Sequence, residues 1–399
     1  MFLATMSMAW NVLAVDEGVR FVCPRNQLSV IKAGMAEYLK SLAIPEELVV
    51  VTERPADGVL VYQLATSSRD TSTLDLYARL SMNVATDEVP LPVGGEATAK
   101  VQTVSRQEIL LALLQHGRLT TLRGPACSVA ALSDHVALRQ NIVAWAENLR
   151  WGWPNGKAAE WNQDYWSFGT PKPGVSLRAA IDDVFSNQSA YAIGCYTATK
   201  LVIVKGVLDY FARVRPSPEL DHLVQSRLLS DHEPLSDVEP GRVWSFEPDF
   251  NPRDALRPGK LLGMVREVSP KNFVPGDWIY FLNTDPVSSQ QSGYEGSNAI
   301  YLGHDRFDDY YGENRHAFTY AEKLDEVYQW RNGVFSRTQD ASKRKPLDVQ
   351  DLERLGSSPE AGGIVKKWRV VPEFFEASAR HELGPVSARS GRLPGRRAP

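Results

Sequence analysis

One apolar helix places the strongest constraint on how this chain can fold. Apolar residues recur at helical spacing, with further apolar residues beside them, at Leu201, Val202, Ile203, Val204, Val207, Leu208 and Phe211. A helix that is apolar around most of its circumference has to be covered by other elements. Lys205 and Asp209 interrupt the run, so it is too short and too charged to cross a membrane. The sequence therefore predicts a buried helix that begins near Gly194 and ends near Arg215.

Two β-like segments follow that helix along the chain. GDWIYFL (276–282) and NAIYLG (298–303) are rich in β-branched and aromatic residues, and the residues between them are typical of turns. The same patterns predict other strands at 48–53, 58–66 and within 362–375, and other helices at 31–42, 105–117, 133–149, 177–185 and 320–331. This mixture predicts an α+β protein.

Length and composition suggest how the chain is divided. Its 399 residues correspond to roughly two to three domains. We expect a separate N-terminal α+β region at 1–137, a core at 138–335 with a proline-rich insertion at 216–275, and a C-terminal extension at 336–399 that ends in a disordered tail. The Pro- and Gly-rich stretch 87–95 is expected to be a loop or boundary.

Charge and cysteine content bear on partners and compartment. With 44 basic and 48 acidic residues the formal charge is -4, so neither nucleic acid nor a membrane is expected as a partner. The odd, sparse set of Cys23, Cys127 and Cys195 argues against a disulfide framework and predicts a reducing compartment. The first fifteen residues lack the basic start of a signal peptide. We therefore expect a cytoplasmic protein, with export by a signal-less route left open.

Cys195 is the strongest candidate for chemistry. It stands at the expected N-terminus of the buried helix, where free N–H groups and the helix dipole stabilise an anion. This position predicts a lowered thiol pKa and a nucleophilic sulfur. The alternative is an inert buried cysteine. A nucleophilic cysteine also needs a base, which papain-like folds supply from a strand that follows the helix.

Other candidate sites are weaker. Cys127 and His135 are eight residues apart, which on a helix is a rise of roughly 12 Å and too far for a nucleophile–base pair. The seven histidines are scattered and no HxxxH or CxxC spacing occurs, so no metal site is expected.

Short segments of the chain together resemble one enzyme family. They are LRQNIVAWAENL (138–149), DYW (164–166), YAIGCYTA (191–198), GDWIYF (276–281) and GSNAIYLG (296–303). In their order and in their residues, these segments are similar to the spore-coat-type bacterial protein-glutamine γ-glutamyltransferases. These enzymes are transglutaminases with a papain-like, NlpC/P60-related core.

The resemblance implies that Cys195 attacks the carboxamide of a protein glutamine, releases ammonia and forms a thioester. A lysine amine would then give an isopeptide cross-link, or water would give glutamate. The implied partners are proteins that present glutamine and lysine side chains. No metal or cofactor is implied.

Three positions depart from the family pattern. Ser297 stands where the family has its catalytic Glu, Gly194 where it has an acid before the cysteine, and Tyr310 where it has a His. Glu295 is the expected replacement base, because residues i and i+2 share one face of a strand and a bulge would bring its carboxylate to the thiol. His304 is a candidate partner, and we expect Tyr310 to line the site.

These departures leave other functions open. One is a papain-like cysteine amidase or peptidase that cuts peptide or peptidoglycan. Another is a non-catalytic binding module, because three polar catalytic positions are replaced. The region 1–137 is expected to recruit a substrate, inhibit the core, or bind a regulatory or delivery partner.

Overall fold

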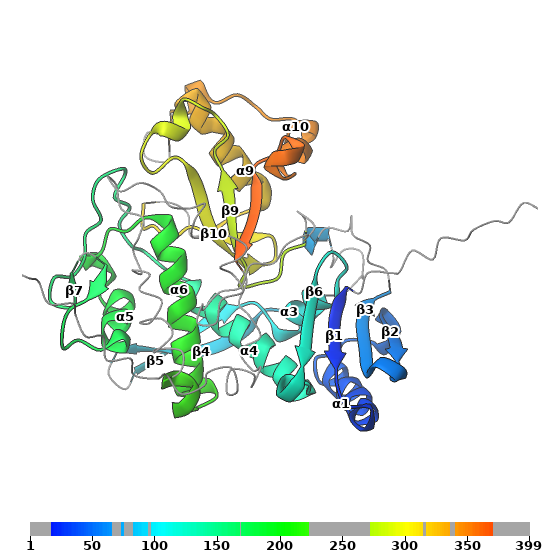
Figure 1. Ribbon diagram of the computed structural model, residues 1–399. Helices are drawn as coiled ribbons and strands as arrows, with labels where there is room; N and C mark the ends of the chain where they lie inside the picture. Colours follow the sequence, from blue (N-terminus) through cyan, green and yellow to red (C-terminus); the bar gives the residue numbers. More distant parts are fainter. Residues whose placement is uncertain are drawn as a thin grey trace, which may run out of the picture.

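The protein is a mixed α and β structure (Figure 1). The computed structural model describes residues 17–65, 73–75, 83–94, 97–167, 169–222, 272–313, 317–335 and 340–369. Most of the expected insertion and the expected disordered tail therefore lie outside the described residues. Within the described part of the chain, no helix is both long and apolar enough to span a bilayer.

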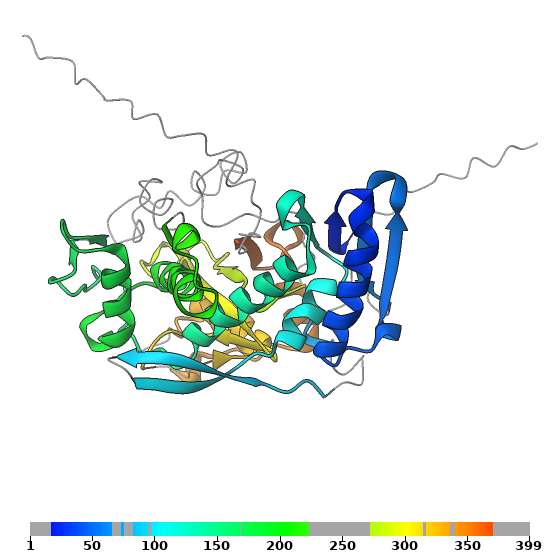
Figure 2. The same ribbon diagram turned by 90° about the horizontal axis from the view of Figure 1, so that it is seen from below.

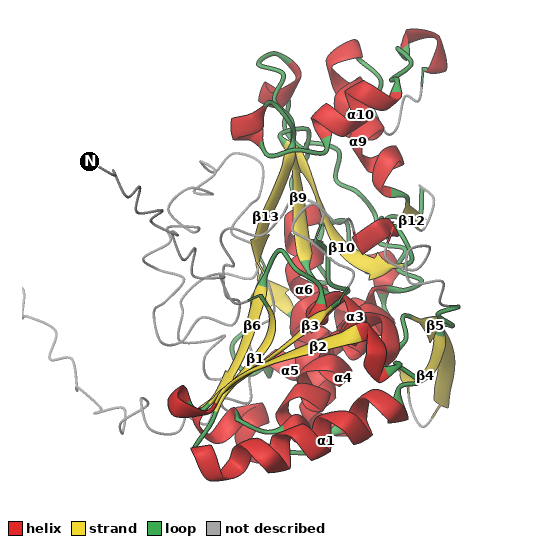
Figure 3. Cartoon of the chain, turned by 90° about the vertical axis from the view of Figure 1, so that its right-hand side faces the viewer, coloured by secondary structure: helices red, strands yellow, loops and turns green. Residues whose placement is uncertain are grey.

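A four-stranded sheet is built mainly from the first part of the chain. Its strand order is β2–β3–β1–β6, from β1 (Gly18–Val22), β2 (Val49–Arg54), β3 (Val59–Leu64) and β6 (Leu119–Arg123). β1 pairs antiparallel with β3 and parallel with β6, and the strands predicted at 48–53 and 58–66 are confirmed as a hairpin. Helices α1 (Leu28–Ser41) and α3 (Arg106–Leu114) lie beside this sheet (Figure 3). Their buried side chains belong to the same apolar core as the sheet.

The stretch expected to be a loop at 87–95 forms a strand instead. β4 (Asp87–Gly94) and β5 (Ala97–Thr103) make a two-stranded ribbon, which runs beneath the helices in Figure 2. The prediction was wrong because a ribbon strand has only one neighbour. Pro90 and Pro92 can therefore be accommodated without breaking a ladder on both sides.

The second sheet is formed by the later part of the chain. Its order is β12–β11–β10–β9–β13, and every pair in it is antiparallel. The strands are β9 (Trp278–Leu282), β10 (Gly296–Gly303), β11 (Arg306–Asp308), β12 (Ala317–Phe318) and β13 (Val365–Arg369). Helix α9 (Tyr320–Gln329) packs against β9, β11 and β12, and α10 (Val349–Leu355) packs against α9.

The predicted buried helix is confirmed as α6 (Cys195–Asp209), followed by a π-helical turn at Tyr210–Val214. Every residue of α6 after Cys195 is buried. α4 (Val129–Ala146) lies along it, and the two backbones come close at Gly206, where an added Cβ would be 2.6 Å from the Ile142 Cα. α5 (Leu177–Ser186) and a short ribbon of β7 (Trp166–Ser167) and β8 (Thr170–Pro171) complete this side.

Two buried links join the early and late parts of the chain. Arg118, before β6, and Arg139, on α4, both donate to the carboxylate of Asp277, which precedes β9, at 2.5 and 2.9 Å. Burial would raise the pKa of Asp277, but the two guanidinium groups hold it below the ordinary value. The helix α4 also runs across the boundary expected between residues 137 and 138.

A disulfide joins Cys23, after β1, to Cys127, before α4, with their Cα atoms 5.7 Å apart. The sequence argument against disulfides was wrong here. It relied on the number of cysteines, whereas pairing depends on which side chains the fold brings together. The predicted reducing compartment loses this support.

Candidate functional site

Cys195 is the first residue of α6, as the sequence predicts. Gly194 is the N-cap, with extended backbone at φ -71° and ψ 156°. The chain before it is fixed because Gly152 N donates to Tyr191 O at 2.9 Å and Ile193 N donates to Gly152 O at 3.0 Å. An added Cβ at Gly194 would have no heavy atom within 4 Å, so the space at this N-cap residue is open.

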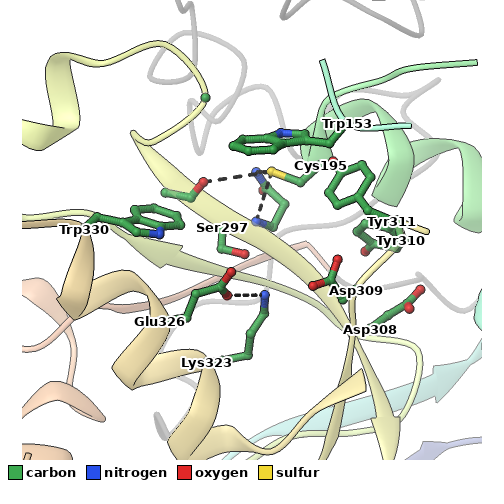
Figure 4. A pocket seen from close by; sticks show the side chains of 13 residues that line it. Trp153, Cys195, Ser297, Asp308, Asp309, Tyr310, Tyr311, Lys323, Glu326 and Trp330 are labelled. Carbon is green, nitrogen blue, oxygen red and sulfur yellow. Dashed lines mark hydrogen bonds and ion pairs between the residues drawn. The ribbon is translucent and has the colours of Figure 1, made fainter. Parts of the chain in front are cut away.

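The thiol faces the start of β10 (Figure 4). Asn298 donates to Cys195 Sγ from its backbone N at 3.4 Å and from Nδ2 at 3.3 Å, and the sulfur lies 3.9 Å from Gly296 O. The Asn298 amide is oriented by Trp278, whose Nε1 donates to its Oδ1 at 2.9 Å. No carboxylate or imidazole of the described residues lies within hydrogen-bond distance of this sulfur.

The environment of the thiol changes one expectation. Burial raises the pKa of the Cys195 thiol above its ordinary value, although the Asn298 donors and the charge of Lys323 act to lower it, and the charge of Glu295 raises it further. The prediction of a lowered pKa was therefore wrong. It counted the helix N-terminus and omitted the desolvation of the sulfur.

A small pocket, with a cavity volume of about 30 Å³, opens over Cys195. Two indole rings, Trp153 from the segment after α4 and Trp330 after α9, stand on either side of it (Figure 4). The other lining residues are Gly293, Gly296, Ser297, Asn298, Asp308, Asp309, Tyr310, Tyr311, Lys323 and Glu326. The pocket therefore combines aromatic walls with a polar, charged floor.

The structure brings some of the residues expected near the thiol into the pocket and leaves another away from the sulfur. Ser297 lines the pocket with 8% of its surface exposed. Glu295 does not reach the sulfur, and its Oε2 accepts from Gly293 N at 2.9 Å. Tyr310 lines the pocket as expected, and its hydroxyl lies 2.7 Å from Thr199 Oγ1 on α6.

His304 is not part of this pocket. With φ of 49° it occupies, together with Asp305, the tight turn between β10 and β11, at the opposite end of β10 from Ser297. Its backbone N donates to Glu108 Oε1 at 2.7 Å, and its Nε2 lies 2.8 Å from Glu108 Oε2. The expected partnership with Cys195 was wrong because the turn directs this imidazole to α3.

The charged floor includes groups that the sequence analysis did not assign to the site. Lys323 and Glu326, on α9, form an ion pair of 2.7 Å. Burial raises the pKa of Asp308 well above its ordinary value, and the charges of Glu147 and Asp309 raise it further. Spacing on α9 places Lys323 and Glu326 on one face, but only the packing of α9 onto the sheet turns that face toward the thiol.

Neither a metal centre nor a second cysteine site is built by these elements. Within the described ranges, no three His, Cys, Asp or Glu side chains are grouped as metal ligands would be. Cys127 is bonded to Cys23, and His135 Nε2 accepts from Arg139 Nε at 3.0 Å.

Comparisons with known proteins agree on one family. The family model described as protein-glutamine gamma-glutamyltransferase matches residues 106–332. The protein-glutamine gamma-glutamyltransferase of Bacillus pumilus (strain SAFR-032) is 27% identical over 253 residues, which cover 60% of this chain and 86% of that protein. The protein-glutamine gamma-glutamyltransferase of Bacillus subtilis (strain 168) is 24% identical over 240 residues, which cover 57% of this chain and 83% of that protein.

A solved transglutaminase from Geobacillus stearothermophilus, without its C-terminal extension, aligns with a TM-score of 0.35 and 21% identity, over 55% of this chain and 87% of that one. The family model, in contrast, spans more than half of the 399 residues. The chain therefore belongs to the protein-glutamine gamma-glutamyltransferase family.

Proposed function

We propose that this protein is a cysteine acyltransferase that forms a thioester between Cys195 and the side chain of a protein glutamine. The observation that carries the proposal is the position of the thiol, at the start of α6 and open to a pocket between two indole rings. The order of α6 followed by the antiparallel strands β9 and β10 is also what a papain-like core requires.

In the proposed reaction the sulfur attacks the carboxamide carbon, and the C–N bond breaks as the nitrogen takes a proton and leaves as ammonia. The amine of a lysine then attacks the thioester to give an isopeptide, or water attacks to give glutamate. The first N–H groups of α6 have no partner within the helix and are suited to stabilise the oxyanion, as is the Asn298 amide.

The base is proposed to be Glu295. Its charge is near enough to raise the pKa of Cys195, which supports this assignment. The carboxylate would have to leave its bond to Gly293 N before it reached the thiol. Glu295→Gln should then lower the rate by about a hundredfold, which is a common loss when a general base is removed.

The decisive test is incorporation of a labelled primary amine into a glutamine-bearing protein, with ammonia release measured in parallel. Wild-type protein should do at least one of these, and Cys195→Ala should do neither. Wild-type protein that does neither, under conditions where an established transglutaminase works, would contradict the proposal. Peptide fragments among the products would instead indicate a cysteine amidase or peptidase.

A binding module without catalysis is the second candidate. Two observations favour it: the raised pKa of the Cys195 thiol, and the lack of a carboxylate or imidazole at its sulfur among the described residues. If Cys195→Ala leaves the binding of a protein partner intact and wild-type protein forms no thioester detectable by mass, this candidate is supported.

A further inference from the structure

Lys323 is a buried cation in the pocket that holds Cys195. Only 4% of its side chain is exposed, although it lies on a helix whose apolar face is made by Leu324 and Val327. Its Nζ lies 2.7 Å from Glu326 Oε2 and 4.5 Å from the centre of the Phe318 ring. Figure 4 shows the ammonium below Ser297, on the floor of the pocket.

Among the described residues that line this pocket, Lys323 is the one basic residue. The titratable groups that face the same space are Asp308 at the end of β11, Asp309 after it, Glu326 on α9, and the phenols of Tyr310 and Tyr311. Glu295, before β10, acts on the sulfur from outside the lining. A negative charge formed on the sulfur would therefore meet several acidic neighbours and one basic one.

The sulfur needs a stabilising charge because it is desolvated and because no base of the described residues touches it. We propose that Lys323 supplies this charge, and that it stabilises the thiolate of Cys195 during acyl transfer. The inference rests on the proposed function, since it assigns Lys323 a role in the reaction of that thiol. Ionisation breaks the S–H bond and passes the proton to the proposed base, the Glu295 carboxylate, so no oxidant or reductant is needed. Lys323 acts on the sulfur through space and does not touch the substrate.

The protonation states agree with this role. Burial would lower the pKa of Lys323, but Glu326 and Asp309 raise it above the ordinary value, so the ammonium stays charged across the neutral range. The same charge acts to lower the pKa of Cys195. A cation beside a cysteine is a known cause of a larger thiolate fraction.

The test measures alkylation of Cys195 by iodoacetamide as a function of pH, with the full chain. Lys323→Met should raise the thiol pKa and slow alkylation by about tenfold at a pH below that pKa, because one pKa unit changes the thiolate fraction tenfold. Glu326→Gln should act in the opposite direction and speed alkylation, since it removes a negative charge from the same pocket. Lys343→Met, at a lysine with 57% of its side chain exposed, is the matched control and should change nothing.

Shifts of the thiol pKa in opposite directions by the two pocket variants would support the inference. A loss of structure would change the accessibility of the thiol, but it would not raise the pKa in one variant and lower it in the other. The inference is overturned if Lys323→Met leaves the pH profile unchanged, or if both variants shift it the same way. If Lys323→Met fails to fold, the inference requires two other results. Lys323→Arg should leave the pH profile of alkylation unchanged, and Glu326→Gln should lower the pKa of the Cys195 thiol. Alkylation does not require a glutamine substrate, so this result stands apart from the outcome of the amine-incorporation test.

Discussion

Ser297→Glu should increase acyl transfer, because it places a carboxylate at the position where the resemblance assigns the catalytic Glu of the family. Ser297 lines the pocket next to Asn298, the residue that holds the Cys195 sulfur. A carboxylate there would add a second candidate acceptor for the thiol proton in this pocket, beside Glu295, whose carboxylate is held by Gly293 N.

The magnitude follows from the value of a positioned base. General base catalysis contributes roughly 10²- to 10⁴-fold, which corresponds to about 2.7 to 5.4 kcal/mol of activation free energy. We expect the lower end, because Asp309 and Glu326 line the same pocket and disfavour another negative charge. Burial and these neighbours should raise the pKa of the new carboxyl, as burial and Asp309 do for Asp308. The gain should therefore develop as the pH rises through that elevated pKa.

The assay is amine incorporation measured from acid to alkaline pH, with Ser297→Gln as the control that has nearly the same shape and no charge. Ser297→Glu should exceed both Ser297→Gln and the wild type. Equal rates for the two variants, in protein shown to be folded, would refute the reasoning that a carboxylate at position 297 is a better base than Glu295.

Three further predictions concern stability. Asp277→Asn should lower the free energy of unfolding by roughly 3 to 5 kcal/mol in chemical denaturation, because it leaves two buried arginines uncompensated. The folded protein holds the pKa of Asp277 low. Its contribution to the free energy of unfolding is therefore present above the unfolded pKa of about 3.9 and is lost as the pH falls through the lower folded value. The stabilities of the variant and the wild type should therefore converge in acid. Cys23→Ser should cost about 2 to 4 kcal/mol, because the bond to Cys127 closes a loop with a sequence separation of 104; equal stability of reduced and oxidised protein would contradict this. Tyr310→Phe should cost about 1 kcal/mol by loss of one buried hydrogen bond to Thr199, measured by thermal unfolding.

Much of the local structure could be predicted because local chemistry decides it. The helix at 105–117 begins as expected, since Ser105 Oγ accepts from Glu108 N at 3.2 Å. The Glu108 carboxylate does not return to Ser105 to complete a capping box, because it binds His304 instead. A pattern within a few residues sets where a helix begins. A side chain that has a stronger partner elsewhere in the fold, however, does not make the local contact that the pattern predicts.

The disulfide and the ribbon show the corresponding limit for the fold. Cys23 and Cys127 are 104 residues apart, and their pairing depends on β1 and the start of α4 lying side by side. Pro90 and Pro92 suggested a loop, whereas the open edge of a two-stranded ribbon accepts them. Neither outcome is encoded in the neighbouring residues alone.

By itself the sequence determined the buried helix, the position of Cys195 at its first turn, and the strands that follow, because periodicity and helix-end chemistry are local properties. Only the tertiary structure decided what surrounds the sulfur. It brought Lys323 to the pocket and directed His304 away from it. It also made desolvation of the sulfur outweigh the Asn298 donors and the charge of Lys323 in setting the pKa of the thiol. Burial and charge act through space, so they depend on residues that are distant in the sequence and meet only in the folded chain.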